Sequence, residues 1–332
     1  MAFPKRGQQI LYLSRAQIEA LDFSMDEVIA AVDAGFREKS AGRVEMPPKP
    51  GIHTRQDAFI HAMPAYLSGL GAAGVKWVSG YPENHRLGLP YITGLLILNC
   101  PETGVPVAVM DCAWITEKRT AGATAVAVRR LAVPGARRLA IIGAGVQGRA
   151  NTDALRRVCP GITTVAAFDP SGQAREIFER EVSAWGLKVE QADSPECAVA
   201  GADIVVTCAP IVQNPQPVIP PEWLKPGSVA VSLDFDATIK PVTAHAVDGI
   251  WVDDTEQFEY YRQHGHFAGM PTRYEEVAGL VSGKTGRRNE AERYLVVNLG
   301  LALEDMATAL PIYKRALDRE VGTWLPCWGV GT

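Results

Sequence analysis

Arg138-Leu139-Ala140-Ile141-Ile142-Gly143-Ala144-Gly145-Val146-Gln147-Gly148 is the stretch that decides the fold of the chain around it. Its apolar residues 139–142 predict a short buried strand of a parallel sheet. The glycines after them have the G-x-G-x-x-G spacing, and the apolar residues that follow repeat at helical intervals. The sequence therefore predicts a strand-to-helix turn that binds a dinucleotide pyrophosphate through Gly143, Ala144, Gly145, Val146, Gln147 and Gly148.

A second predicted strand, Val165–Phe168, leads to Asp169, which lies about 20 residues beyond Gly148. An acid at this distance accepts a hydrogen bond from a ribose 2′-hydroxyl and repels a 2′-phosphate. Because the next arginine is Arg175, the sequence predicts NAD rather than NADP as the cofactor. The end of the following strand is expected to line the cofactor through Thr207, Cys208 and Ala209.

Composition limits the class of protein. A chain of 332 residues with 47% hydrophobic content suits two domains, and a formal charge of −4 does not favour nucleic acid as a partner. No apolar run approaches the ~18 residues of a membrane span. The polar stretch Met1–Gln9 has no apolar signal core, so a cytoplasmic protein is expected. Six cysteines without C-x-x-C spacing predict reduced thiols rather than disulfides or a metal site.

The chain before the glycine turn differs in kind from the chain after it. Ser14 and Ser24 are expected to cap helices, and a proline-rich stretch, Met46–Pro50, is expected to be extended. Strand-like runs follow at 58–63, 74–79, 91–98 and 105–110, and turn residues 99–104 join the last two as a hairpin. This first part therefore predicts an α+β domain with antiparallel pairing.

Beyond Asp169, strand and helix patterns alternate, which predicts an α/β doubly wound parallel sheet. Further strands are expected at 188–191, 203–208, 228–233 and 250–253. Phe258–Arg273 is expected to be a mobile loop. Helices are expected at 275–282 and 301–317, with Pro311 breaking or kinking the second.

Several short runs together resemble the ornithine cyclodeaminase/μ-crystallin family. They are Met63-Pro64-Ala65-Tyr66, Gly74-Val75-Lys76-Trp77-Val78-Ser79-Gly80, Lys118-Arg119-Thr120-Ala121-Gly122-Ala123-Thr124, the glycine turn, and Gly300-Leu301-Ala302-Leu303-Glu304-Asp305. The resemblance implies a substrate-binding and dimerisation domain, residues 1–117 and 308–332, around a Rossmann NAD-binding domain, residues 118–307. It also implies chemistry at the Cα–N bond of a small amino or imino acid.

The resemblance identifies Arg119 as the arginine that binds the substrate carboxylate, with Thr120 at the cofactor phosphates. A guanidinium suits this task because it donates two parallel hydrogen bonds. Lys76, a charged residue inside an apolar strand, matches the family's substrate-site lysine for carboxylate contact or proton transfer. Lys49 matches a second basic carboxylate contact less closely and equally suits a loop lysine.

Asp234 follows the predicted strand 228–233, at a carboxyl end where α/β sheets bind ligands. Ammonia-releasing members of the family carry an aspartate here, four residues before a lysine, whereas this chain has Thr238 at that position and Lys240 as its nearest lysine. Asp234 is expected to act as a general base or to cap a loop, and Asp236 is the rival carboxylate.

His61 stands where the cyclodeaminases tend to carry a glutamate that faces a side-chain amine of the substrate. The exchange removes a negative charge and argues against a substrate such as ornithine, although a core histidine bonded to the backbone fits as well. Glu304 and Asp305 are expected either to orient active-site groups or to serve in a cap or ion pair.

These observations favour an NAD-dependent oxidoreductase that acts on a small amino or imino acid, with Lys76 and Asp234 as catalytic residues. Its expected substrate contacts are Lys49, His61, Lys76 and Arg119. The alternatives are an NAD-recycling cyclodeaminase that releases ammonia and a nucleotide-gated binding protein. A homodimer is expected, because the hairpin-rich sheet has an apolar face for a second copy.

Overall fold

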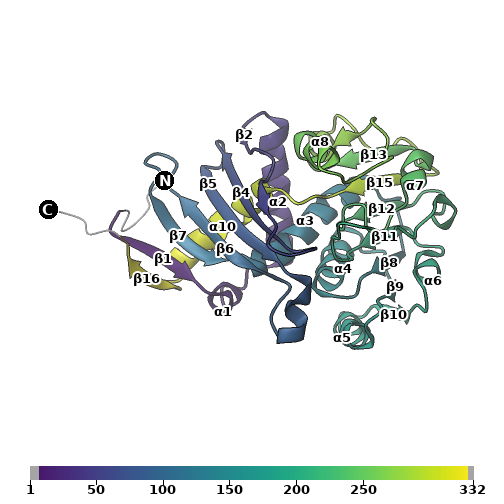
Figure 1. Cartoon of the computed structure of the whole chain (residues 1–332), viewed down its shortest axis with the longest axis horizontal. Helices are drawn as coiled ribbons and strands as arrows, with labels where there is room; N and C mark the ends of the chain where they lie inside the picture. Colours follow the sequence, from purple (N-terminus) through teal and green to yellow (C-terminus); the bar gives the residue numbers. More distant parts are fainter. Residues whose placement is uncertain (1–6, 328–332) are drawn as a thin grey trace. The chain divides into compact units, whose positions relative to one another are not determined.

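The computed structural model describes residues 7–327, so most of the polar stretch at residues 1–9 lies outside it (Figure 1). The chain divides into two compact units. Unit 1 combines the chain up to Arg119 with the chain from Leu301 onward, and unit 2 is Thr120–Gly300. The first boundary falls inside one helix, α3 (Ala113–Leu131).

Unit 1 contains a mostly antiparallel sheet in the order β16-β1-β7-β6-β5-β4-β2, with β3 paired to β4. Only β1 and β7 pair in parallel within this order. The expected hairpin is confirmed, because β6 and β7 pair antiparallel. The strands are β1 (Gln9–Leu13), β2 (Val44–Glu45), β3 (Gly51–Ile52), β4 (Phe59–Leu67), β5 (Ala72–Gly80), β6 (Ile92–Asn99), β7 (Pro106–Asp111) and β16 (Thr323–Pro326).

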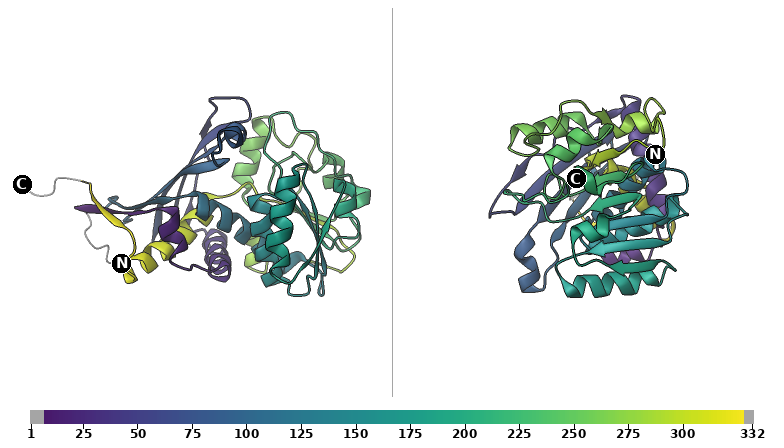
Figure 2. Two further views of the ribbon diagram at one scale, coloured as in Figure 1. Left: turned by 90° about the horizontal axis from the view of Figure 1, so that it is seen from below. Right: turned by 90° about the vertical axis from the view of Figure 1, so that its right-hand side faces the viewer.

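Helices cover one face of this sheet. α10 (Ala302–Asp318) packs against β4, β5 and β6, and α2 (Met25–Ser40) lies beside α10 (Figures 1 and 2). Ser14 caps α1 (Arg15–Glu19) and Ser24 caps α2, as expected, each with a capping box. A short 3₁₀ helix, η1 (Pro82–Leu87), links β5 to β6.

Pro311 does not end α10. Of the expected break or kink, the break is wrong, because one helix continues through Pro311 to Asp318. A proline removes one hydrogen bond and crowds the preceding turn, but nearly every side chain of α10 around it is buried. Tertiary packing therefore offsets the local cost.

The opposite face of the same sheet is apolar and open to solvent in the chain described. Side chains alternate along each strand, so Lys76 and Val78 face α10 whereas Trp77 points away. Trp77 is 47% exposed, Leu95 beside it 45%, and Tyr66 38%.

Unit 2 is a parallel sheet in the order β10-β9-β8-β11-β12-β15-β13-β14, which confirms the predicted α/β class (Figure 1). The chain reverses its direction of winding between β8 and β11, which is where doubly wound sheets bind ligands. The strands are β8 (Arg138–Ile142), β9 (Thr164–Phe168), β10 (Lys188–Gln191), β11 (Ile204–Thr207), β12 (Val229–Ser232), β13 (Gly249–Val252), β14 (Glu275–Glu276) and β15 (Tyr294–Val297).

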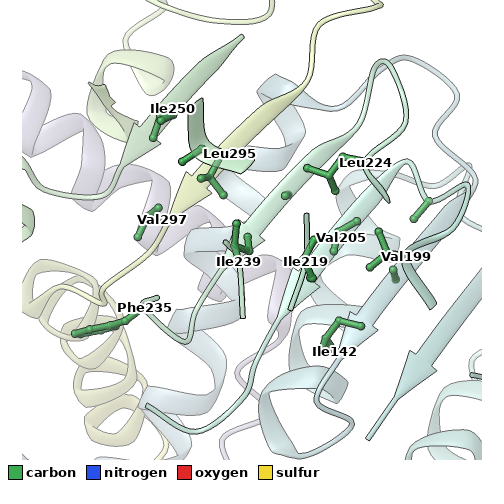
Figure 3. Packing of buried hydrophobic residues seen from close by; sticks show 14 of the residues in the cluster. Ile142, Val199, Val205, Ile219, Leu224, Phe235, Ile239, Ile250, Leu295 and Val297 are labelled. Atoms are coloured by element: carbon green, nitrogen blue, oxygen red, sulfur yellow. The ribbon is translucent and has the colours of Figure 1, made fainter. Parts of the chain in front are cut away.

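The helices of unit 2 alternate with these strands. They are α4 (Val146–Val158), α5 (Gly172–Ser183), α6 (Pro195–Val199), η2 (Pro221–Trp223), α7 (Pro241–Ala246), α8 (Thr255–Gln263) and α9 (Val277–Val281). Aliphatic side chains from β8, β11 and β15 fill the core on one face of the sheet, together with Ile219, Ile239 and Phe235 (Figure 3).

Two expectations for unit 2 are wrong. No strand is expected at Tyr294–Val297, yet β15 lies between β12 and β13 and all four of its residues are buried. The segment expected as a mobile loop begins inside α8, and its Phe258 and Phe267 are buried with ring centroids 4.7 Å apart. No helix between residues 7 and 327 has both the length and the apolar character needed to cross a membrane.

Candidate functional site

The glycine turn has the geometry of a phosphate-binding loop. Gly143 has φ +104°, and a Cβ there would lie 2.7 Å from the Cys208 carbonyl oxygen. A Cβ at Gly148 would lie 2.3 Å from the Gly143 carbonyl oxygen, so α4 packs close to β8 only because this residue is glycine. A Cβ at Gly145 would meet no heavy atom of the described chain within 4 Å. Gly145 thus borders open space at the start of α4, where no side chain caps the helix.

Asp169 ties the end of β9 to this turn. One carboxylate oxygen accepts a hydrogen bond from Ala144 N at 2.8 Å, and the other accepts from Ser171 N at 2.8 Å. These bonds fix the carboxylate at the carboxyl end of β9, directly beside β8. The position suits recognition of a ribose hydroxyl.

Three further predicted cofactor contacts in unit 2 lie at the same edge of the sheet, and a fourth lies on α3. Thr207, Cys208 and Ala209 lie at the end of β11, the neighbour of β8. Thr120 lies on α3, and its carbonyl oxygen accepts a hydrogen bond from Thr124 Oγ1 at 3.3 Å.

Asp234 is fully buried and accepts four hydrogen bonds from its own chain. The donors are Thr207 Oγ1 (2.8 Å), Ser232 Oγ (3.0 Å), Ala209 N (3.0 Å) and Thr238 Oγ1 (2.6 Å). Burial raises the pKa of Asp234, and the four donors oppose this shift. The carboxylate therefore connects the ends of β11 and β12. This arrangement corresponds to loop capping, one of the two roles expected for Asp234; the other is general-base catalysis.

Asp236 lines a cavity of about 280 Å³. Its carboxylate lies 3.1 Å from His266 Nδ1 and accepts a hydrogen bond from Phe267 N at 2.7 Å. Burial opposes ionisation, but these hydrogen bonds outweigh it and hold the pKa of Asp236 below its usual value. Asp236 also stands four residues before Lys240. This is the aspartate-to-lysine spacing of the ammonia-releasing family members, which Asp234 lacks.

Asn298 is a candidate that the sequence analysis missed. It follows β15 directly, and its backbone N–H donates to the Ser232 carbonyl oxygen at 2.9 Å. The residue is only 3% exposed, yet neither atom of its side-chain amide has a hydrogen-bond partner within residues 7–327. A buried amide without partners is costly and is expected to meet a ligand. Asn298 was missed because the strand that carries it was missed.

Unit 1 brings Lys76, Arg119, Glu304 and Asp305 together in its interior. Lys76 Nζ lies 2.8 Å from the Asp305 carboxylate. Arg119 donates from Nε to Asp305 at 3.0 Å and from Nη1 to Glu304 at 2.7 Å. The Arg119 side chain is 7% exposed and the other three are 0% exposed. Two of the three expected substrate cations, Lys76 and Arg119, thus share one buried network.

Burial governs the protonation of this network. It lowers the pKa of Lys76, as does the nearby charge of Arg119, whereas Asp305 opposes the shift. Burial raises the pKa of Glu304, and Arg119 opposes that shift. Pairing with opposite charges, rather than contact with water, is therefore what opposes neutralisation of these groups.

His61 and Lys49 are buried as well. The charges of Lys49 and Lys76 both act on His61, which relates them to this network. Burial lowers the pKa of His61 to about 2, with further lowering by the charges of Lys49, His53 and Lys76, so the imidazole is neutral. Its ring stacks on Phe59 with centroids 4.3 Å apart. A Cβ at Gly51 would lie 2.3 Å from the ring, so His61 is held between an aromatic face and a glycine backbone.

Comparisons with known proteins point to one family. A model of the ornithine cyclodeaminase/mu-crystallin family matches residues 9–320. Alanine dehydrogenase of Archaeoglobus fulgidus is 33% identical over 328 residues, which cover 95% of this chain and 98% of that protein. The structure of Thermococcus litoralis Δ1-pyrroline-2-carboxylate reductase with NADH and L-proline has a TM-score of 0.85 and 32% identity, covering 95% of this chain and 99% of that one. An archaeal alanine dehydrogenase dimer with bound NAD has a TM-score of 0.84 and 30% identity, covering 96% and 100%.

Proposed function

Because this chain belongs to the ornithine cyclodeaminase/mu-crystallin family, we propose that it is an NAD-dependent oxidoreductase acting on the Cα–N bond of a small amino or imino acid. The observation that carries this proposal is the buried network in unit 1. It presents two cations, Lys76 and Arg119, that are already held in place by Glu304 and Asp305. Such a pair suits a small anion better than a large neutral ligand.

The neutral His61 bears on the side chain of the substrate. Burial lowers the pKa of His61 to about 2, so it adds no charge beside the network. His61 offers a side-chain amine no carboxylate to pair with, so a neutral substrate side chain is favoured.

The cofactor is NAD, and the residues of unit 2 fit it. Gly145 leaves space beside the N–H groups that begin α4, which suits a pyrophosphate. Asp169 suits the adenosine ribose, and the unpartnered amide of Asn298 complements the donor and acceptor of a carboxamide. When bound, NAD supplies a site that accepts or gives a hydride.

The remaining chemistry belongs to side chains of this chain. Arg119 and Lys76 hold the substrate carboxylate and so orient its Cα–N bond. A carboxylate of this chain moves the proton at the substrate nitrogen. We favour Asp236 over Asp234 for this step, because Asp234 is fully buried whereas Asp236 lines a cavity.

A change in NADH absorbance tests the proposed reaction. The enzyme is offered single amino acids with NAD, and 2-oxo acids with ammonia or methylamine and NADH. We expect net formation or consumption of NADH with small substrates that carry a neutral side chain. If no substrate in the panel changes the absorbance, the proposed oxidoreductase activity is refuted.

An NAD-recycling cyclodeaminase is the second candidate, because the family contains this chemistry. Such an enzyme would release ammonia from ornithine or lysine without net NADH formation. His61 is neutral and stacks on Phe59, which argues against a substrate with a side-chain amine. Ammonia release from ornithine at constant NADH absorbance would favour this alternative.

NAD(H) is expected to bind at least tenfold more tightly than NADP(H), a difference of about 1.4 kcal/mol. The reason is the Asp169 carboxylate, which is held beside the glycine turn by Ala144 and Ser171 and would face a 2′-phosphate. Fluorescence titration with both reduced cofactors measures this ratio. Equal affinities would remove Asp169 from the cofactor site.

The enzyme is expected to be a homodimer that buries the open face of the unit 1 sheet. Trp77, Leu95 and Tyr66 form an apolar surface there that a second copy would cover. Light scattering at micromolar concentration should give twice the chain mass, and Trp77→Glu should reduce it to the monomer mass. A wild-type monomer under these conditions would contradict the proposal.

We place the reaction in the cytoplasm. Six cysteines without paired spacing suit a reducing compartment.

A further inference from the structure

One carboxylate joins the two cations of unit 1. Asp305 lies in the first turn of α10, and its oxygens contact Lys76 on β5 at 2.8 Å and Arg119 on α3 at 3.0 Å. The Asp305 side chain is 0% exposed. Lys76 and Arg119 are therefore linked through a residue that lies far from both in the sequence.

Asp305 and Glu304 together fix the plane of the Arg119 guanidinium. Nε donates to Asp305, and Nη1 donates to Glu304, so two different edges of the group are held by neighbouring residues. A guanidinium binds a carboxylate well only in a suitable plane, because its donors form a rigid fork. Loss of either acceptor would leave the group more freedom to rotate.

Asp305 also favours the charged form of Lys76, against the effects of burial and of the charge of Arg119. The groups that face Lys76 come from every element around it: Arg119 and Thr116 on α3, Cys112 just before α3, Glu304 and Asp305 on α10, and His61 on β4. His61 is neutral, and burial raises the pKa of Cys112 to about 12, so the thiol is neutral as well. Asp305 is the carboxylate in direct contact with the Lys76 ammonium.

We propose that Asp305 is a positioning residue that keeps Lys76 charged and holds Arg119 in the plane needed to grip the substrate carboxylate. The inference rests on the proposed function only in taking Lys76 and Arg119 as the carboxylate contacts. Asp305 itself need not touch the substrate. Its effect should therefore be seen in the pH at which a carboxylate ligand is lost.

Two probes of nearly equal shape separate charge from fit: pyrrole-2-carboxylate and pyrrole-2-carboxamide. Each is titrated calorimetrically into the intact enzyme saturated with NADH, from about pH 6 to about pH 10. We expect the wild type to prefer the carboxylate, and to lose that preference at alkaline pH as Lys76 loses its proton. An ammonium group beside an anion has a raised pKa. The Asp305 carboxylate should therefore extend the preference for the carboxylate probe to higher pH.

Asp305→Asn removes the anion and keeps the size of the side chain. Without it the pKa of Lys76 falls further, so the ammonium is lost at lower pH. The carboxylate affinity is expected to fall at least tenfold, and its alkaline limit to move down by about one to three pH units. Glu304→Gln is the matched control, because Glu304 contacts Arg119 rather than Lys76. The pH at which the carboxylate probe is lost should therefore fall less in Glu304→Gln than in Asp305→Asn.

Lys76→Arg keeps the test valid if Asp305→Asn does not fold, because it retains the buried charge. A guanidinium does not titrate in this range, so the alkaline loss of the carboxylate should disappear. If the loss stays at the wild-type pH in Lys76→Arg, or in a folded Asp305→Asn, then Asp305 has only a structural role. If the wild type itself binds the two probes equally, the proposed carboxylate site fails, and the role of Asp305 fails with it.

Discussion

Arg119→Lys should lower kcat/KM for the substrate roughly tenfold to a hundredfold. Lysine keeps the charge but loses the planar fork that binds a carboxylate through two hydrogen bonds, and a charge-assisted bond contributes about 1.5–3 kcal/mol. The affinity for NAD should not change, because the expected contacts of NAD lie in unit 2. Steady-state kinetics and a cofactor titration on the same preparation measure both quantities.

Arg119→Ala should have a larger effect and a different cause. It leaves Glu304 and Asp305 buried without the cation that both contact, and loss of one partner of a buried ion pair costs about 3–5 kcal/mol. We therefore expect a lower melting temperature as well as lost activity. Arg119→Lys is the fairer test of substrate binding, and unchanged turnover in that variant would place the carboxylate site elsewhere. Lys49 and Lys76 would then be examined next.

Gly145→Ala should abolish most NAD binding without weakening the fold. A Cβ at this position meets no heavy atom of the described chain within 4 Å, so the protein itself has room for it. The same methyl group would occupy the space expected for the pyrophosphate, and we expect a loss of at least a hundredfold in affinity, about 2.8 kcal/mol. The melting temperature without NAD should match that of the wild type.

Gly148→Ala is the matched control three residues further along the chain. Its Cβ would lie 2.3 Å from the Gly143 carbonyl oxygen and 3.0 Å from Ile141 Cγ2, so α4 and β8 must move apart. Such overpacking typically costs about 1–3 kcal/mol, so this variant should melt at a lower temperature even without cofactor. Normal NAD affinity in Gly145→Ala would exclude the open space beside Gly145 as the pyrophosphate site.

Local sequence signals predicted those elements of the fold that are determined by residues close to one another in the chain. The run of apolar residues, glycines and helical spacing from Arg138 onward predicts β8, its turn and α4, because each step is decided within a few residues. The alternation of strand and helix predicts the parallel sheet for the same reason. β15 was not predicted because a run of only four apolar residues fits a strand and one turn of a helix equally well. Short apolar runs are told apart as strand or helix mainly by their length.

The candidate site was harder to predict because its contacts are long-range. The family resemblance identified Lys76 and Arg119, but nothing near them in the chain indicates that Asp305 contacts both. Asp234 presents the opposite case. Its position after a strand suggested catalysis. Three of its four hydrogen bonds, however, come from Thr207, Ala209 and Thr238, whose placement only the folded chain determines.

The order of the strands also constrains when the protein can fold during synthesis. β15 is the last strand of unit 2 to leave the ribosome, yet it lies between β12 and β13, which cannot pair with their neighbour until it arrives. Unit 1 likewise needs α10 to cover its sheet and β16 to pair with β1, the first strand made. A nascent chain that ends before Tyr294 therefore carries two incomplete sheets with unpaired edges. Its dependence on chaperones should be greatest just before the final segment is translated.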